Sequence, residues 1–275
     1  MRALGTSDRE VAALMTEATK LAADYWASLE ERPSYPSTSG TETARLFDRP
    51  WSDEGQGSEV LNDVKAIAEH VRPCTGRFFG YVAGSGEPVG AIGDFLASVL
   101  NQNSTSWRSA PAAVTIERTV IGWLAEAVGC SGFAGSLCGG GSIANLMALA
   151  IARENILPAN EAGARPGVVY ASEQVHMSIP KAIALLGLGR SNLRVIPVDE
   201  DFRLRTDALE AAIASDRKSG KTPVAIVASV GTVATGAMDP LREIAKSRRP
   251  KVFGSMSTAP WRRWRRWRLR RSSKD

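Results

Sequence analysis

The sequence predicts an α/β protein with a mostly parallel sheet. In the second half of the chain, short apolar runs alternate with segments whose apolar residues recur at helical spacing. A strand, a glycine turn and a helix stand at the head of this alternation, at residues 133–153, and three polar or glycine-rich motifs each follow an expected strand. Strands separated by helices form βαβ units, whose carboxyl ends share the edge of the sheet where ligands bind.

Composition favours an ordinary globular protein. The 275 residues are 44% hydrophobic, enough for one large domain or two modest ones. No run approaches the roughly 18 apolar residues of a membrane span, and the N-terminus lacks the apolar core of a secretory signal, so we expect a cytoplasmic protein. Cys74, Cys130 and Cys138 are odd in number and form no C-x-x-C pair, which fits reduced thiols better than disulfides or a metal site.

The positive charge is concentrated in the last fifteen residues. The net charge is +5, but Trp261 to Asp275 alone carries +7, which leaves −2 for residues 1–260. Its run WRRWRRWRLRR interleaves aromatic and cationic side chains, a pattern that binds nucleic acid or anionic membranes. A cationic nucleic-acid- or membrane-surface-binding protein is therefore the alternative hypothesis. Because the rest of the chain offers no basic face, we expect neither nucleic acid nor membrane as a partner.

The first hundred residues predict a helical N-terminal segment. Ser7 is a suitable N-cap for a helix over 8–31, and Pro73 ends a second helix. A loop is expected at 33–42, because proline, serine and glycine dominate it. Helices are expected at 8–31, 58–71 and 89–100. Between the last two lie Phe78, Phe79 and Tyr81 beside glycines, which fit either an apolar substrate pocket or simple packing.

Residues 101–250 predict the sheet domain. A strong amphipathic helix over 112–128 ends at Gly129. Buried strands are then expected at 133–138, 167–172, 193–197 and 223–230, and helices at 142–153, 178–186, 206–215 and 240–246. The alternation gives this segment its α/β character.

The turn Gly139–Gly141 with Ser142 as helix N-cap is the first candidate site. Glycines let the backbone approach a ligand, and the unpaired N–H groups at a helix start favour an anion such as phosphate. A plain turn between strand and helix explains GGGS equally well, since neither common phosphate-binding fingerprint is satisfied.

Two further candidates follow later strands. His176 comes after the second expected strand and Thr232, in GTVATG, after the last. Each fits ligand binding, and each alone also fits a packing or turn role. Their shared edge with the glycine turn favours the functional interpretation, whereas His70 lacks such a context and is interpreted as structural.

Six motifs in series carry a resemblance to a known family. In order they are TGRFFGYV, SWRSAPAAVTIE, GSLCGGGSIANLMAL, SEQVHMSIPKAIALLGLG, PVDEDFRLRTDALEAAI and VASVGTVATGAMDPLREIA. From Thr75 to Ala245 the chain resembles the group II pyridoxal-phosphate-dependent decarboxylases, which include the aromatic-amino-acid and glutamate enzymes.

The resemblance implies a fold, a reaction and a partner. The fold is the fold type I large domain, with a mostly parallel sheet, helices on both faces and a helical N-terminal arm. The reaction is removal of the α-carboxylate of an amino acid, and the expected assembly is a homodimer.

The resemblance also implies roles for single residues. Gly140, Gly141 and Ser142 would hold the phosphate of pyridoxal 5′-phosphate. His176 would be catalytic and stack on the pyridine ring, and Thr232 would lie against the cofactor. The aromatic residues implied beside the substrate are Phe78, Phe79 and Tyr81. The chain departs from the family where Thr75-Gly76 replaces a usual His-Pro pair and Val233 a usual threonine.

Two parts of the family's machinery have no counterpart here. The family uses a lysine as Schiff-base nucleophile and an aspartate, two residues after a histidine, that pairs with the pyridine nitrogen. Neither motif occurs in this sequence, so we expect a C-terminally truncated domain that is inactive as it stands.

We interpret residues 251–275 as an aberrant tail. Codons for the family's Trp-Phe-His-Val-Asp-Gly-Ala, read one base later, permit Gly-Ser-Met-Ser-Thr-Ala-Pro, which is Gly254 to Pro260. The tail therefore predicts a one-base slip, or a sequencing error, shortly before Lys251.

Overall fold

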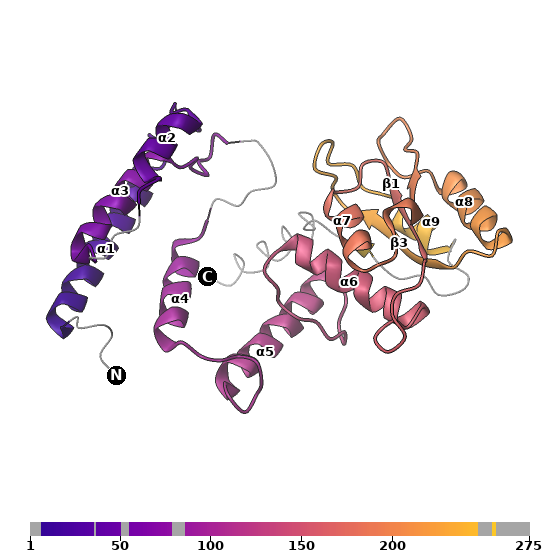
Figure 1. The fold of residues 1–275 in the computed structure, drawn as a ribbon, viewed down its shortest axis with the longest axis horizontal. Coiled ribbons are helices and arrows are strands. Elements are labelled where there is room, and N and C mark those ends of the chain that lie inside the picture. Colours follow the sequence, from indigo (N-terminus) through magenta and orange to yellow (C-terminus); the bar gives the residue numbers. More distant parts are fainter. Residues whose placement is uncertain (1–6, 36, 51–54, 79–85, 247–254, 257–275) are drawn as a thin grey trace, which may run out of the picture. The chain divides into compact units, whose positions relative to one another are not determined.

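The computed structural model describes residues 7–35, 37–50, 55–78, 86–246 and the backbone of 255–256 (Figure 1). The chain divides into two compact units, residues 1–100 and 101–275, and each is described by itself.

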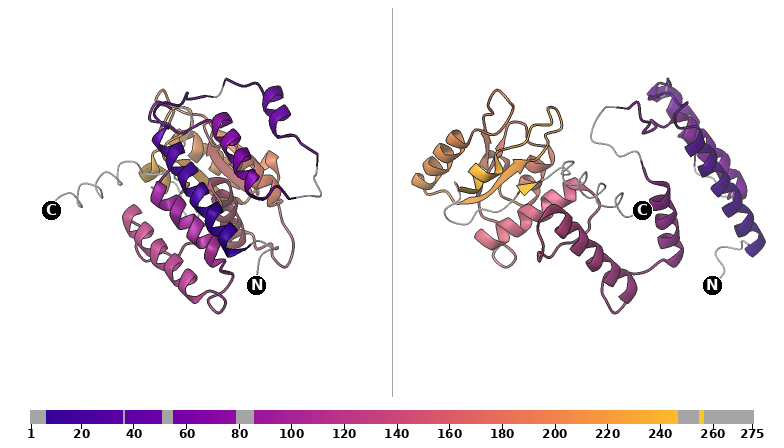
Figure 2. Two further views of the ribbon diagram at one scale, coloured as in Figure 1. Left: turned by 90° about the vertical axis from the view of Figure 1, so that its left-hand side faces the viewer. Right: turned by 180° about the vertical axis from the view of Figure 1, so that it is seen from behind.

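The first unit is helical in its described part. Its elements are α1 (Asp8–Ala27), α2 (Gly40–Phe47), the 3-10 turn η1 (Gly57–Glu59), α3 (Val60–His70) and α4 (Pro88–Leu100). Ser7 caps α1 as predicted: its hydroxyl accepts from the Glu10 N–H, and the Glu10 carboxylate accepts from the Ser7 N–H at 2.7 Å. Helices α1 and α3 pack against each other (Figure 2).

The prediction of a loop through residue 42 was wrong, because α2 begins at Gly40. Ser39 and Glu42 form a second capping box, with the Ser39 N–H donating to Glu42 at 2.7 Å. The S-x-x-E spacing that marks a helix start was present in the sequence. The neighbouring proline and glycine residues concealed it.

The second unit is the predicted α/β domain. Helices α5 (Pro111–Val128) and α6 (Gly141–Ile156) precede the sheet. Then follow β1 (Val168–Ser172), α7 (Ser178–Leu185), the 3-10 turn η2 (Arg190–Asn192), β2 (Leu193–Ile196), α8 (Thr206–Lys218), β3 (Pro223–Ser229), α9 (Leu241–Lys246) and β4 (Ser255–Met256). Gly129 ends α5 in the left-handed conformation, φ 79°.

Among the described residues, four strands form one parallel sheet in the order β2-β1-β3-β4. Tyr170 pairs with Arg194 on one side of β1 and with Ile226 on the other. Because β1 and β3 are parallel neighbours, the loops after Ser172 and Ser229 leave the sheet at the same edge.

Alternate residues of the strands bury opposite faces of the sheet. Val169 and Ala171 of β1 pack with Leu149 of α6 and Ile183 of α7. Val168 and Tyr170 pack on the other face, in a core completed by Leu209 and Ile213 of α8, Ile226 and Ala228 of β3, and Ile244 of α9. The sheet is thus covered by helices on both faces, as fold type I requires, which accounts for the near-continuous apolar character of β1 and β3.

The expected strand at 133–138 does not form, and this prediction was wrong. Phe133 and Leu137 are exposed rather than buried, as is Cys138. The Leu137 N–H donates to the Glu117 carboxylate of α5 at 3.1 Å instead of to a neighbouring strand. Gly135 and Ser136 interrupt the apolar run, and glycine inside a strand weakens it.

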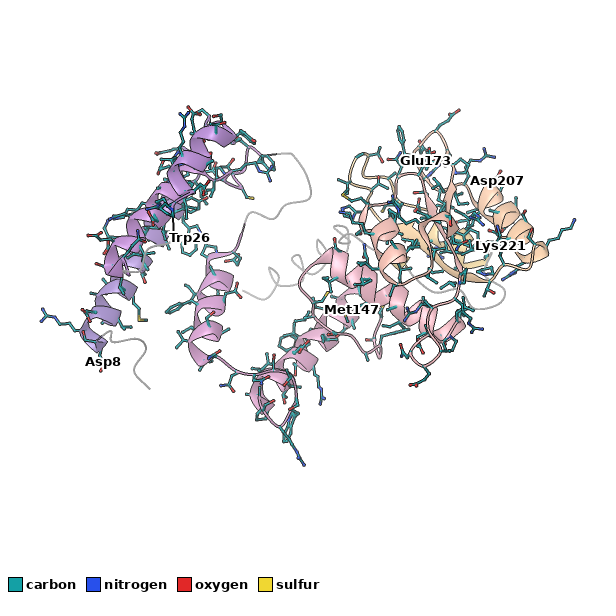
Figure 3. The ribbon with its side chains drawn as sticks, viewed as in Figure 1. Asp8, Trp26, Met147, Glu173, Asp207 and Lys221 are labelled. Carbon is teal, nitrogen blue, oxygen red and sulfur yellow. The ribbon has the colours of Figure 1, made fainter. Side chains whose placement is uncertain are left out.

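A cluster of charged and polar side chains around buried Asp216 ties β1, β2 and α8 together on one face. The Tyr170 hydroxyl donates to Asp216 at 3.1 Å, Arg194 contacts both oxygens of that carboxylate, each at 2.9 Å from its closest nitrogen, and Lys221 approaches it at 3.3 Å (Figure 3 labels Lys221). Burial acts to raise the pKa of Asp216, but these donors together hold it below its usual value. The pKa of Tyr170 is raised, mainly by burial and next by the negative charge of Asp216.

In the described ranges no helix is long and apolar enough to cross a bilayer, and no cluster of potential metal ligands is found. All three cysteines are unpaired. The Trp/Arg-rich run and the predicted frame change lie outside the described residues, apart from the two residues of β4.

Candidate functional site

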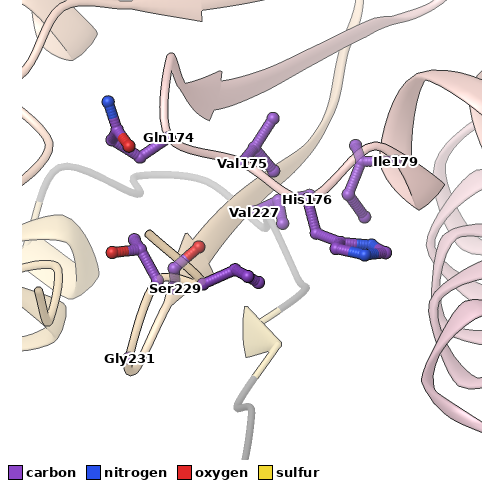
Figure 4. Close-up of a pocket in the computed structure, with 9 residues that line it drawn as sticks. Gln174, Val175, His176, Ile179, Val227, Ser229 and Gly231 are labelled. Atoms are coloured by element: carbon purple, nitrogen blue, oxygen red, sulfur yellow. The ribbon is translucent and has the colours of Figure 1, made fainter. Parts of the chain in front are cut away.

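A pocket lies at the carboxyl edge of β1 and β3, where the sequence placed two candidate residues (Figure 4). The loop after β1 faces the loop after β3 across it. His176 and Thr232 both line it, one from each loop. The remaining lining residues are Gln174, Val175, Ile179, Val227, Ser229, Gly231 and Val233.

Hydrogen bonds from α7, and through it from α6, hold the Nδ1 side of the His176 ring. Its Nδ1 lies 2.8 Å from the Ser178 hydroxyl and 3.2 Å from the Ser178 backbone nitrogen, whose N–H donates to it. The Ser178 hydroxyl in turn lies 2.6 Å from Nδ2 of Asn145, a residue of α6. Asn145 and Ser178 are buried, whereas His176 itself is exposed. One side of the imidazole is therefore fixed while the ring remains available to a ligand.

Thr232 is buried in a tight turn that begins at Gly231, φ 102°. Its N–H donates to the Ala237 carbonyl at 3.0 Å, and its hydroxyl lies 2.6 Å from that of Thr235. The Ala237 N–H donates to the same Thr232 oxygen at 3.2 Å. These bonds give the GTVATG motif one compact shape at the pocket wall.

Asp239 clamps this turn to the sheet. One carboxylate oxygen accepts from the Ser229 N–H at 2.7 Å and the other from the Leu204 N–H at 2.8 Å, while the Asp239 N–H donates to the Ser229 carbonyl at 2.8 Å. Its side chain is buried, and burial raises its pKa in spite of these hydrogen bonds. Sequence reasoning missed Asp239, because its partner Leu204 is 35 residues away.

The glycine turn leads into α6 two residues earlier than predicted. Gly140, not Ser142, is the N-cap; its φ of 127° lies where side chains are rarely found, and no side chain among the described residues caps the helix. A Cβ added at Gly139, Gly140 or Gly141 meets no described atom within 4 Å. The start of α6 is thus an uncapped helix N-terminus whose glycines are not crowded by other described atoms, a feature that favours an anion.

Of the three candidate elements, His176 and Thr232 share a pocket, whereas the glycine turn is connected to it only through the helix that follows. The structure brings His176 and Thr232 into one pocket, and Asn145 connects α6, which the glycine turn opens, to His176. Gly140, Gly141 and Ser142 do not themselves line this pocket. Phe78 belongs to the first unit, where the Arg72 guanidinium lies 4.8 Å from its ring centre. Phe79 and Tyr81 lie outside the described residues.

A parallel sheet covered on both faces, with a pocket at its carboxyl edge, is the arrangement in which α/β domains bind ligands at that edge. Comparisons with known proteins identify the family to which this α/β domain belongs. The chain belongs to the pyridoxal-dependent decarboxylase family, whose conserved domain matches residues 41–249. The family is described as one of pyridoxal-dependent decarboxylases, so the resemblance read from the six motifs is confirmed.

Individual relatives agree with this assignment. The chain is 39% identical over 169 residues to an aromatic-L-amino-acid decarboxylase of Bacillus atrophaeus, an overlap of 61% of this chain and 35% of that one. It is 34% identical over 242 residues to a tyrosine decarboxylase of Oryza sativa subsp. japonica, covering 81% of this chain and 44% of the relative. The chain thus spans less than half the length of these curated relatives.

A solved structure shows the same fold. The crystal structure of mouse CSAD superposes with a TM-score of 0.83 at 28% identity, over 90% of this chain and 54% of that protein. The fold type I assignment is therefore confirmed.

Proposed function

We propose that this chain is the cofactor-binding part of a pyridoxal-phosphate-dependent amino-acid decarboxylase. The observation that carries the proposal is the convergence of His176 and Thr232 in one pocket at the carboxyl edge of the sheet. An α-amino acid is the proposed substrate, and the proposed setting is a cytoplasmic homodimer, in keeping with the family and with three unpaired cysteines.

The residues present fit the cofactor's phosphate. The proposed seat is formed by Gly140, Gly141 and Ser142, because a sixteen-residue helix starts there without a side-chain cap and no described atom lies within 4 Å of a Cβ added at either glycine. Backbone N–H groups hold a phosphate by charge-assisted hydrogen bonds. The positive φ of Gly140 aims the chain at this seat without the cost that a side chain would add.

The proposed roles of the pocket residues follow from their positions. His176 presents an imidazole whose Nδ1 side is already hydrogen-bonded, so its ring face is free to stack on an aromatic ligand. Thr232 forms the opposite wall, in a turn that its own hydrogen bonds keep rigid. The pyridine ring of the cofactor, when bound, accepts the electron pair left by the departing carboxylate.

The chain lacks a nucleophile where the reaction needs one. No lysine lines the described pocket, and no lysine of this sequence follows the family's histidine–aspartate pattern. We therefore propose that the chain binds pyridoxal phosphate noncovalently and is inactive in decarboxylation by itself.

Titration of the purified chain with pyridoxal phosphate tests this proposal. Binding is followed by absorbance and fluorescence in the wild type, H176A and T232V, with H70A as the matched histidine control. We expect weaker binding in H176A and T232V, no change in H70A, no lysine adduct after borohydride reduction and no carbon dioxide released from amino acids. Equal binding in all four proteins would contradict the assigned site, and one specific lysine adduct would contradict the proposed inactivity.

A further inference from the structure

We propose that Asn145 and Ser178 act as positioning residues that hold His176 in one tautomer and one ring orientation. The three side chains come from three elements: Asn145 from α6, Ser178 from the first turn of α7, and His176 from the loop after β1. They form an unbroken chain of hydrogen bonds, 2.6 Å from Asn145 to Ser178 and 2.8 Å from Ser178 to His176.

The direction of each hydrogen bond follows from chemistry. The Ser178 backbone N–H donates to Nδ1 of His176, so Nδ1 is an acceptor and carries no proton. The Ser178 hydroxyl, also in contact with Nδ1, must then donate its proton to it. A hydroxyl that donates there is left to accept from Asn145, and the atom of Asn145 that faces it is the donor Nδ2. The proton of the neutral imidazole is thereby assigned to Nε2.

Burial makes this arrangement rigid. Asn145 and Ser178 are 1% and 4% exposed, so water does not readily replace a broken bond. Oδ1 of Asn145 is buried and has no hydrogen-bond partner among the described residues. An apolar side chain would fill this place without leaving a polar atom unpaired, so packing alone does not explain an asparagine here. The donor Nδ2 does explain it.

The hydrogen-bond chain from Asn145 through Ser178 to His176, here called the relay, also connects the two parts of the proposed site, the glycine turn and the pocket. Asn145 lies one helical turn beyond Gly141, where α6 begins at the glycine turn. The helix that offers its N-terminus to an anion is thus the helix that orients the imidazole through Ser178. This consequence for cofactor binding rests on the proposed function, whereas the tautomer and ring order of His176 do not.

Nitrogen NMR of the full chain tests the relay directly. The chain has only two histidines, so an H70Q sample assigns the ring signals of His176. In the wild type we expect Nδ1 to resonate as an unprotonated, hydrogen-bonded nitrogen and Nε2 as a protonated one. In S178A and N145L, the Nδ1 signal should move toward that of a less strongly bonded acceptor and the ring should become less ordered.

Three variants separate the relay from a general loss of structure. S172A is the matched control, because Ser172 is an equally buried serine at the end of β1 whose hydroxyl has no partner among the described residues. It should leave the His176 signals unchanged. S178T restores the hydroxyl and should restore the wild-type Nδ1 signal. N145L keeps the branching of asparagine at Cγ but has neither polar atom, so it reports on the lost donor even if S178A melts early.

Pyridoxal phosphate binding gives the second readout. Loss of one such hydrogen bond should weaken binding by about three- to tenfold in S178A and N145L, with no change in S172A. A protonated Nδ1 in the wild type, or an unchanged Nδ1 signal in N145L, would overturn the relay. If the wild type shows the expected NMR signals but binds no pyridoxal phosphate, the relay stands and the proposed function fails.

Discussion

Replacing Asp239 should show how strongly the pocket depends on a residue that does not line it. The Asp239 carboxylate accepts hydrogen bonds from two backbone N–H groups, those of Ser229 at the end of β3 and Leu204 before α8. D239N can accept only one of them, because its amide nitrogen is itself a donor. D239A accepts neither. Both changes leave buried donors without an acceptor at the junction that carries the Thr232 turn.

The structure sets the size of the effect. Each buried donor left unsatisfied costs about 1–3 kcal/mol, so we expect D239N to lower the free energy of unfolding by about that amount and D239A by about 2–6 kcal/mol. Because burial raises the pKa of Asp239, the folded wild type holds its proton more tightly than the unfolded chain. The free energy of unfolding of the wild type therefore falls as pH rises from the ordinary carboxyl pKa to the raised one. The loss of this free energy caused by D239N should become smaller over the same pH range.

Urea unfolding followed by circular dichroism measures these differences as shifts of the transition midpoint. D199A is the matched control: the Asp199 carboxylate also accepts from two backbone N–H groups, at 3.0 and 2.9 Å, but 37% of its side chain is exposed to water. We expect a much smaller loss in D199A. Equal losses in D239A and D199A would refute the argument that burial sets the cost.

Two further predictions concern the sheet and the tail. R194M removes the bidentate partner of buried Asp216 and should lower the free energy of unfolding by about 1–3 kcal/mol at neutral pH, whereas R203M, at an exposed pair, should have little effect. The hydrogen-bond donors around Asp216 hold its pKa below the usual value, so the stability that the ionised Asp216 adds is present above the ordinary carboxyl pKa. This stability is lost as pH falls through the lowered pKa. The loss of unfolding free energy caused by R194M should therefore be smaller in acid. Resequencing the gene near codon 251 should reveal His-Val-Asp in the next reading frame, just beyond the family match that ends at residue 249; a frame without it would contradict the predicted slip.

Local signals made most of the second unit predictable from sequence. Gly129 ends α5 because a left-handed residue is needed there, and valine and isoleucine mark β1 and β3. The same local reasoning failed at residues 133–138, where Phe133 and Leu137 suggested a strand. Whether such a run pairs depends on a neighbouring strand, and Leu137 bonds to a helix side chain instead.

The site was predictable only in its outline. His176 and Thr232 were expected to lie close together because they follow strands that share one edge of a parallel sheet, and both line one pocket. The residues that position them were not predicted, since Asn145 meets Ser178 across 33 residues and Asp239 meets Leu204 across 35. No spacing rule in a single sequence connects partners that the tertiary fold alone brings together.

The most direct test of the account is whether the chain recognises the phosphate of the cofactor at the start of α6. Isothermal titration with pyridoxal phosphate and with pyridoxal, which lacks the phosphate, compares the two dissociation constants in the wild type, G140A and G132A. Gly132 also has a positive φ, 83°, with no described atom within 4 Å of an added Cβ, so G132A tests an alanine at another positive-φ glycine away from the turn. We predict that the wild type and G132A prefer pyridoxal phosphate by about 10- to 100-fold and that G140A loses this preference. Equal affinity of the wild type for both compounds, or a preference that survives in G140A, would contradict the proposed cofactor site.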